Sequence, residues 1–231
     1  MTVLDPAAAL TRAARAVDEA RDVDAVVQAI TESAVISLPG IEHAGVSLMR
    51  EDRPIETRGA TSDLPRILDD LQYDFREGPC YDAMVEGTPD VLVADNIRHD
   101  QRWPNYVPRA VKHGLKSQMG VRLFNTDGVH GALNLYSMEN DEIPAETVDM
   151  ASLFAVNAAV VLGRVLLEQN LRAAMATRTV IGVATGLVMG KYGVTQEKAF
   201  QYLTRISQDT NTKLRTVAEQ IVENASGTPA E

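Results

Sequence analysis

Residues Ile181 to Gly193 read IGVATGLVMGKYG, an apolar run in which glycine recurs at every fourth position. Helical periodicity places Gly182, Gly186 and Gly190 close to one face of a helix. Each glycine in a helix interior costs about 0.5–1 kcal/mol relative to alanine. We interpret this bare face as one that another backbone or a ligand approaches closely, and for Gly182 we expect tight packing against a neighbouring helix.

The sequence around this run predicts three short helices within residues 176–224. Gly193 suits the position after the end of the first helix, and Thr195 is a good N-cap for the second. Thr210 or Asn211 is expected to cap the third. Apolar residues recur at helical spacing in the second and third helices: Ala199, Phe200, Leu203 and Ile206, then Leu214, Val217, Ala218, Ile221 and Val222.

A long helix is predicted upstream, from Pro144 past Leu171. Positions along it alternate by four and three residues, which is typical of a coiled-coil seam. Before Val161 we expect the helix to pack on the chain's own sheet, and beyond Arg164 a partner helix would cover the seam better. We therefore expect a homodimer through residues 150–175. The seam consists of Leu153, Asn157, Val160, Arg164, Leu167 and Leu171.

The first two thirds of the chain alternate between strand and helix patterns. Five antiparallel strands with flanking helices predict an α+β fold. The expected strands cover 43–50, 54–61, 90–95, 117–125 and 130–138; the expected helices cover 7–20, 23–38, 64–75 with Asp63 as N-cap, 81–86 and 105–113. The domains are expected at 1–164, 165–175 (connecting helix), 176–224 and 225–231 (flexible tail).

Charge and composition limit the classes of function that this chain could have. The net charge is −10, but residues 1–172 carry 16 Lys/Arg against 27 Asp/Glu, whereas residues 173–231 carry 6 against 5. Only the C-terminal part would therefore not repel a nucleic acid. We find no signal peptide, no apolar run approaching the roughly 20 residues of a membrane span, no metal-ligand spacing and no catalytic motif. We expect a cytoplasmic protein that is not an enzyme and holds no metal or cofactor.

Aromatic residues gather in the loop-rich middle segment and could line a small-molecule pocket on the sheet. Ordinary packing of loops onto the sheet explains them equally well. The single cysteine, Cys80, is interpreted as a small buried hydrophobe rather than a reactive thiol. The candidate pocket residues are Tyr73, Phe75, Cys80, Tyr81, Trp103 and Tyr106.

Two family resemblances follow from longer stretches. The segment REGPCYDAMVEGTPDVLVADNIRHDQRWPNYVPRAVKHGLKSQMGVRLF, from Arg76 to Phe124, and GALNLYS after it resemble a GAF sensory domain of the actinobacterial type. The segment RTVIGVATGLVMGKYGVTQEKAFQYLTRISQDTNTKLRTVAEQIV, from Arg178 to Val222, resembles the ANTAR domain more specifically. The resemblance implies a three-helix module that binds paired RNA stem-loops and acts in transcription antitermination.

This resemblance suggests which residues would bind RNA. Where the family has Ala-Lys-Gly, this chain has Thr185 in place of the lysine, and Lys191 is a partial substitute. Gly186 is expected to contact an RNA loop, and Tyr192 and Tyr202 are possible stacking surfaces. The expected RNA-binding residues are Arg178, Thr185, Gly186, Met189, Lys191, Arg205, Ser207, Lys213 and Arg215.

Two alternatives stay open for the C-terminal module. It could be a protein-interaction or dimerisation module without RNA affinity, which the loss of the lysine at Thr185 favours. It could also be a DNA-binding helix-turn-helix, but its last helix has only two cations, both at its beginning.

Overall fold

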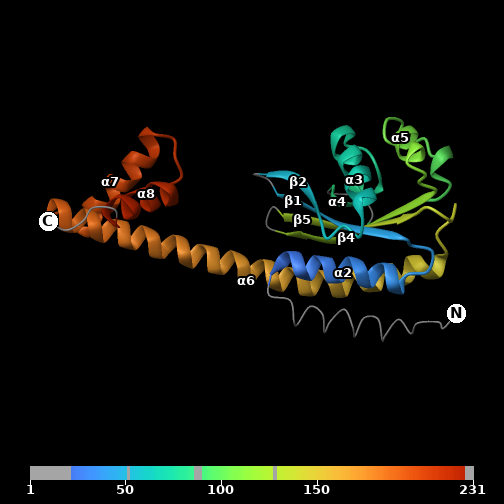
Figure 1. The fold of residues 1–231 in the computed structure, drawn as a ribbon, viewed down its shortest axis with the longest axis horizontal. Coiled ribbons are helices and arrows are strands. Elements are labelled where there is room, and N and C mark those ends of the chain that lie inside the picture. The colour runs from blue at the N-terminus through green and yellow to red at the C-terminus, as the bar shows by residue number, and fades with distance from the viewer. Residues whose placement is uncertain (1–21, 51–52, 86–89, 127–128, 227–231) are drawn as a thin grey trace. The chain divides into compact units, whose positions relative to one another are not determined.

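The computed structural model describes residues 22–50, 53–85, 90–126 and 129–226, drawn in colour in Figure 1. These residues form two compact units, of which the first ends at Leu166 and the second begins at Leu167. The helix expected over residues 7–20 lies outside the described residues, and so does the end of the expected tail, residues 227–231.

A five-stranded antiparallel sheet forms the middle layer of the first unit, in the order β2-β1-β5-β4-β3. This sheet and its flanking helices confirm the predicted α+β fold. β2 ends earlier than expected because Gly59 takes a left-handed φ of +56° and lies against the backbone of Val27. The strands are β1 His43–Arg50, β2 Arg53–Arg58, β3 Val91–Ala94, β4 Ser117–Thr126 and β5 Val129–Ser137.

The two faces of the sheet differ in character because successive side chains along a strand point to opposite faces. Val46, Met119 and Leu133 lie in an apolar core that they share with helices α2 (Val23–Ser37) and α6 (Ala145–Tyr192). Ser47 on β1 and Asn134 on β5 are equally buried, but their side chains point to the opposite face. That face is therefore polar and contacts α3 and α4.

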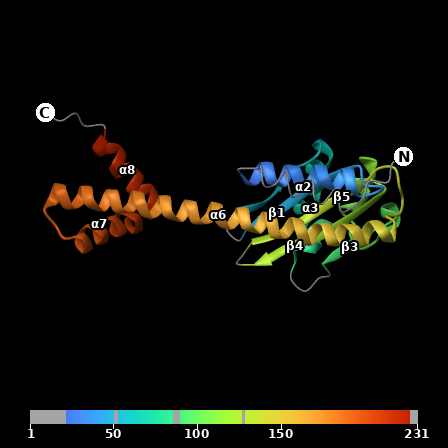
Figure 2. The ribbon, with the colours of Figure 1, turned by 90° about the horizontal axis from the view of Figure 1, so that it is seen from below.

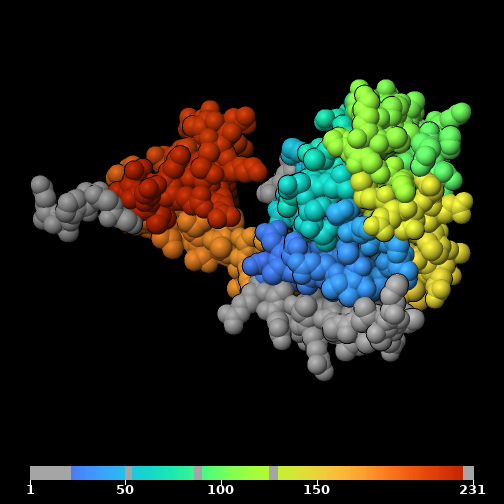
Figure 3. All heavy atoms as spheres, turned by 45° about the vertical axis from the view of Figure 1, so that its right-hand side comes forward, coloured from blue at the N-terminus to red at the C-terminus, as the bar shows by residue number. Residues whose placement is uncertain are grey.

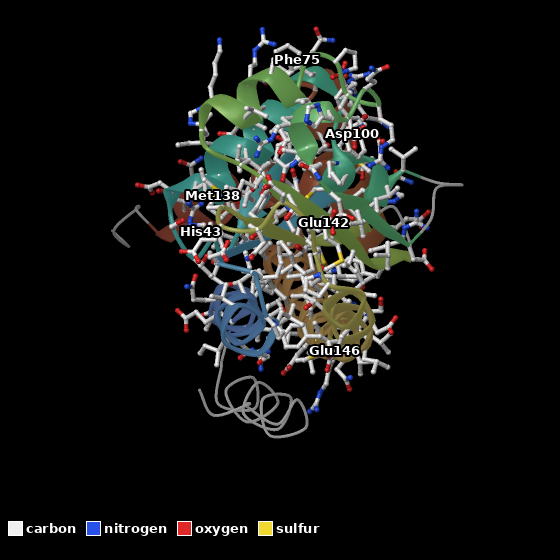
Figure 4. All side chains as sticks on the ribbon, turned by 90° about the vertical axis from the view of Figure 1, so that its right-hand side faces the viewer. His43, Phe75, Asp100, Met138, Glu142 and Glu146 are labelled. Carbon is white, nitrogen blue, oxygen red and sulfur yellow. The ribbon has the colours of Figure 1, made fainter. Side chains whose placement is uncertain are left out.

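Helices cover both faces of the sheet. Figure 2 shows α2 and the first part of α6 on one face, and the end-on view of Figure 4 shows them side by side there. In Figure 3, α2 (blue) and the segment of α5 (green) lie on opposite sides of the first unit. The bounds are α2 Val23–Ser37, α3 Asp63–Phe75, α4 Pro79–Met84, the 3-10 helix η1 Ile97–His99 and α5 Val107–Lys112.

Three helix ends in this unit differ from the sequence expectation. Asp63 is the first residue of α3 rather than its cap, and Ser62 occupies the cap position. α4 starts two residues before Tyr81, because Pro79 has a φ that suits the first turn of a helix. α5 is shorter than the expected 105–113.

The second unit begins within helix α6, which runs unbroken from Ala145 to Tyr192. The first of the three expected short helices is therefore wrong: it is the end of α6. Residues 164–181 contain no glycine or proline that would break the helix. As predicted, Gly193 follows the helix end with a φ of +62° and donates its N–H to the Met189 carbonyl.

Two further helices complete the second unit, α7 Gln196–Asp209 and α8 Leu214–Ser226. Thr195 caps α7 as predicted, since its hydroxyl accepts from the Lys198 N–H. The expectation for α8 is wrong: Thr210 is the C-cap of α7, and Asn211 has a φ of +48° in the turn that follows. Phe200 was expected on the apolar face of α7 with Ala199 and Leu203, but unlike them it is 45% exposed. The buried core consists of Ala184, Val188, Ala199, Leu203, Val217 and Ala218.

By length and composition alone, α6 could cross a membrane, contrary to the expectation that no stretch comes near this. This is weak support for a membrane protein because core helices of soluble proteins pass the same test. In α6, Ala151, Phe154 and Leu162 are buried in the core under the sheet.

Candidate nucleic-acid interface and sensory network

A groove of about 840 Å³ lies between α6 and α7 in the second unit. Four of the residues that the sequence assigned to RNA binding meet in it: Arg178, Thr185, Gly186 and Met189. We call it the glycine groove. Its lining is completed by Ile181, Gly182, Gln196, Glu197 and Phe200.

The glycines of α6 leave open space. A Cβ added to Gly182, Gly186 or Gly190 would meet no atom within 4 Å. The expectation that Gly182 packs tightly against a neighbouring helix is therefore wrong for the residues described here. The core-facing side of this part of α6 carries Ala184 and Val188, so the glycines lie on a different face. Two of them, Gly182 and Gly186, line the glycine groove and leave its α6 side open.

Some polar side chains of the glycine groove have a hydrogen-bond partner within the chain, and others have none among the described residues. Thr185 is 5% exposed, and its hydroxyl donates to the Ile181 carbonyl at 2.7 Å. It therefore supplies no free hydroxyl hydrogen to a ligand in this conformation. Arg178 and Glu197 are exposed, and neither has a hydrogen-bond or ion-pair partner among the described residues. They are the cation and the anion of the groove lining.

A second groove of about 450 Å³ lies among α6, α7 and α8, and we call it the tyrosine groove. The rings of Tyr192 and Tyr202 stand 5.9 Å apart at 51° in it, and the Lys191 Nζ lies 5.6 Å from the Tyr192 ring. Lys191 thus lines a different groove from Thr185. It is not part of the glycine-groove lining, so whether it partly substitutes for the missing lysine stays a prediction. The remaining lining residues are Leu187, Val188, Ile206, Ile221, Asn224 and Ala225.

The other residues assigned to RNA binding line neither groove. Arg205 lies 3.6 Å from Asp209, and Arg215 lies 2.7 Å from Glu219, each pair one helical turn apart. The Ser207 hydroxyl donates to the Thr212 carbonyl and so holds the turn after α7. Lys213 directly precedes α8 and is exposed. The assigned set is therefore spread over the unit rather than gathered at one place.

The polar face of the sheet in the first unit carries a buried hydrogen-bond network centred on Asp69 of α3. The Asp69 carboxylate accepts from the Tyr136 hydroxyl, from Thr57 Oγ1 at 2.7 Å and from Asn134 Nδ2 at 2.9 Å. The Tyr73 hydroxyl bonds to both Ser47 and Thr57. Burial raises the pKa of the Asp69 carboxyl to about 7, and these hydrogen bonds only partly oppose it.

The network continues to Cys80 of α4. Its thiol lies 2.9 Å from Gln118 Nε2, and Gln118 also accepts from the Tyr106 hydroxyl. Cys80 is fully buried, as expected for a small buried side chain, and burial raises the pKa of its thiol. Burial likewise raises the pKa values of Tyr106 and Tyr136.

The predicted pocket residues are only partly brought together. Cys80, Trp103 and Tyr106 share one buried cluster, in which the Trp103 Nε1 donates to Asp82. Phe75 lies at the outer edge of the helical layer in Figure 4, and Arg109 stacks on its ring at 4.3 Å. Tyr81 is half-buried.

Sequence reasoning missed the central residues of the network, namely Asp69, Ser47, Thr57 and Asn134. Two of them could have been found from the sequence, because Ser47 and Asn134 are polar residues within otherwise apolar strands and so mark the strand face opposite the apolar core. Asp69 gave no such signal, since carboxylates are frequent on exposed helix faces. Among the described residues, no three His, Cys, Asp or Glu side chains lie together as metal ligands would.

The seam on α6 faces away from the sheet. The part of α6 before Val161 packs on the sheet as expected, through Phe154 and Ala158, but the seam residues do not take part: Leu153 is 65% exposed and Val160 71%. Leu167 and Leu171 of the second unit are also exposed, at 61% and 56%. The residues that do contact the sheet core lie at other phases of the helix, such as Phe154 and Leu162.

Comparison with known proteins identifies both units. Residues 20–163 match the GAF domain family, and residues 169–222 match the ANTAR domain family. No curated protein matches the chain.

Solved structures resemble the first unit's fold at low sequence identity. The GAF domain of a phosphoenolpyruvate-protein phosphotransferase from Coxiella burnetii has a TM-score of 0.56 at 10% identity, covering 74% of this chain and 99% of that one. A LuxR family transcription factor from Burkholderia cenocepacia that depends on N-acylhomoserine lactone scores 0.55 at 14%, covering 71% and 96%. The chromophore-binding domain of a bacteriophytochrome from R. palustris scores 0.53 at 13%; this chain is covered over 70% and spans 61% of that one. At these identities the likeness concerns the fold alone.

Proposed function

We propose that this chain, which belongs to the GAF domain family and continues into an ANTAR domain, is a cytoplasmic, homodimeric antiterminator that binds paired RNA stem-loops in response to a signal. Its first unit is a sensory domain, and its second unit is an RNA-binding antitermination domain. The proposal gives the chain no enzymatic activity. Bound RNA would be held so that a terminator hairpin does not form.

The glycine groove is the proposed site of RNA contact. The observation that carries this is the convergence of Arg178, Gly186 and Met189 on one open groove. Proteins read RNA loops by stacking unpaired bases and by placing cations on phosphates. Arg178 supplies an unpaired guanidinium, and Phe200 supplies an aromatic ring that is 45% exposed.

A homodimer suits a paired target because each protomer would bind one stem-loop. Support comes from the exposed seam of α6, where Leu167 and Leu171 are 61% and 56% exposed with respect to the described residues. Apolar residues at steps of three and four are covered by a second helix in coiled coils.

The signal is proposed to act on the polar sheet face of the first unit, under α3 and α4. There the Asn134 Oδ1 is buried and accepts no hydrogen bond from the residues described. A small ligand with a donor group could satisfy it, and buried polar groups without partners are costly. No cofactor is part of the proposal.

The test is binding of the full chain to tandem RNA hairpins at several salt concentrations. Affinity is expected to fall as salt rises, because phosphate contacts release counterions. Arg178→Ala should weaken binding and reduce the slope of log affinity against log salt by about 1. Arg205→Ala is the matched control: it removes the same charge from a residue outside both grooves.

Four results would count against the proposal or against the site that it names. Equal affinity for unstructured RNA would remove stem-loop recognition. Tighter binding to duplex DNA than to hairpins would favour a helix-turn-helix. Stable dimers without RNA affinity at any salt would favour a protein-interaction module. A loss from Arg205→Ala as large as that from Arg178→Ala would move the RNA surface away from the groove and support the sequence-based assignment of Arg205.

A further inference from the structure

The glycine groove has two unlike walls. The α6 wall is bare at Gly182 and Gly186, where an added Cβ would meet nothing within 4 Å. The α7 wall carries Gln196, Glu197 and Phe200. Residues three and four apart on a helix are neighbours on its surface, so Phe200 lies next to both Gln196 and Glu197. The groove thus offers an aromatic ring beside polar groups, facing a wall that lacks side chains at Gly182 and Gly186.

Glu197 does not fit a surface that only attracts phosphates. It is the acidic residue of the groove lining, and no described residue forms an ion pair or hydrogen bond with it. Its place in the first turn of α7 suits the helix dipole, which explains an acidic residue there. An unpaired carboxylate beside a polyanion, however, repels phosphates, and the RNA groups that suit it are hydrogen-bond donors such as the N–H groups of a base.

Among RNA bases, guanine matches a carboxylate best. Its N1–H and its N2 amino group are adjacent donors, so they can meet both carboxylate oxygens at once. Adenine and cytosine each offer one amino group on that edge, and uracil offers one N–H. These edges are free only in unpaired bases, such as those of a hairpin loop.

We propose that Glu197 is a specificity residue that selects an unpaired guanine, which enters the glycine groove, lies against the Phe200 ring and donates N1–H and N2–H to the carboxylate. The inference rests on the proposed RNA-binding function. The bare wall at Gly182 and Gly186 gives room for the nucleotide, and Arg178 on the same wall is the cation for its phosphate.

The test starts from RNA hairpins with randomised loops, selected for binding to the full-length wild-type chain and, separately, to Glu197→Gln. The wild type should enrich guanine at one loop position, and Glu197→Gln should lose this preference. For the selected hairpin, Glu197→Gln should bind about 10-fold more weakly or worse, because glutamine replaces one acceptor with a donor. Replacing that guanine by inosine, which lacks the N2 amino group, should weaken wild-type binding and leave Glu197→Gln nearly unchanged.

Controls separate recognition from charge and folding. Glu223→Gln removes the same charge from an exposed position of α8 outside both grooves and should bind like the wild type. Phe200→Leu keeps an apolar side chain but removes the ring, so it should weaken binding of every loop. Thermal unfolding of each variant reports whether the fold is intact.

The outcomes separate the two proposals. If Glu197→Gln binds all hairpins slightly more tightly, Glu197 merely repels RNA and the inference is overturned. If wild type and Glu197→Gln enrich the same loops, it is overturned as well, while RNA binding stands. If the wild type binds no hairpin even at low salt, the proposed function fails and the inference fails with it.

Discussion

Replacing Gly186 by alanine should make α6 more stable and RNA binding weaker. The backbone there is helical, and the added Cβ meets no atom within 4 Å, so the methyl group causes no clash. Alanine is favoured over glycine in a helix interior by about 0.5–1 kcal/mol. That gain corresponds to amide hydrogen exchange slowed by roughly two- to five-fold over the end of α6, if exchange occurs by local opening.

RNA affinity should change in the opposite direction, because the same methyl group projects into the glycine groove. Filling space that a ligand needs costs about 1–3 kcal/mol, which is roughly 5- to 150-fold in affinity. Gly190→Ala is the matched control: its Cβ also meets nothing within 4 Å, and it does not line the groove. It should slow exchange to the same extent and leave RNA binding unchanged.

Two assays on the full chain decide the matter, hydrogen–deuterium exchange of residues 180–192 and titration with a tandem hairpin. Faster exchange in Gly186→Ala would mean that the bare face is packed in solution, which contradicts the open geometry. Equal RNA affinity of Gly186→Ala and Gly190→Ala would refute the assignment of RNA to this groove, whatever the exchange data show.

Three further perturbations test other parts of the account. Gly120→Ala should destabilise the first unit by about 1–3 kcal/mol in chemical unfolding, because its Cβ would lie 2.4 Å from the Pro79 carbonyl oxygen; an unchanged midpoint would refute the packing of α4 on β4. Because the pKa of Asp69 is raised to about 7 in the folded state, the folded protein keeps a proton there that the unfolded protein releases above about pH 4. The free energy of unfolding should therefore fall by roughly 1.4 kcal/mol per pH unit as the pH rises from about 4 to about 7. Asp69→Asn should remove this component from the pH profile measured alongside the wild type, and identical profiles would show that Asp69 does not titrate in that window. Leu171→Lys should weaken the proposed dimer, since it places like charges on facing helices. If the mass measured by sedimentation at micromolar concentration stayed that of a dimer, the seam would not be the dimer interface.

Local patterns were enough to predict the architecture. Alternating apolar residues located all five strands, and Gly193 and Thr195 marked the end of α6 and the start of α7. These features depend on neighbours in sequence, so the sequence carries them. Helix boundaries were predicted less well: residues 164–181 lack a glycine or proline that would break a helix, yet a boundary was placed among them, and α6 continues through them.

The candidate site was predicted in part because surface roles depend on which residues meet in space. Arg178, Thr185, Gly186 and Met189 meet in one groove, while Lys191 lines another, since positions a few residues apart on α6 point in different directions. In the first unit, the Asp69 network joins residues up to 87 positions apart in the sequence, such as Ser47 and Asn134. No spacing rule connects residues at that separation.

The central claim is that the glycine groove holds the RNA loop, and site-specific photo-crosslinking tests it most directly. A photoreactive phenylalanine analogue is placed at position 200, in the glycine groove, or at position 202, in the tyrosine groove, and each protein is irradiated with a tandem hairpin. The account predicts a strong crosslink from position 200 to a loop nucleotide and little from position 202. A crosslink from position 202 with none from position 200 would contradict it.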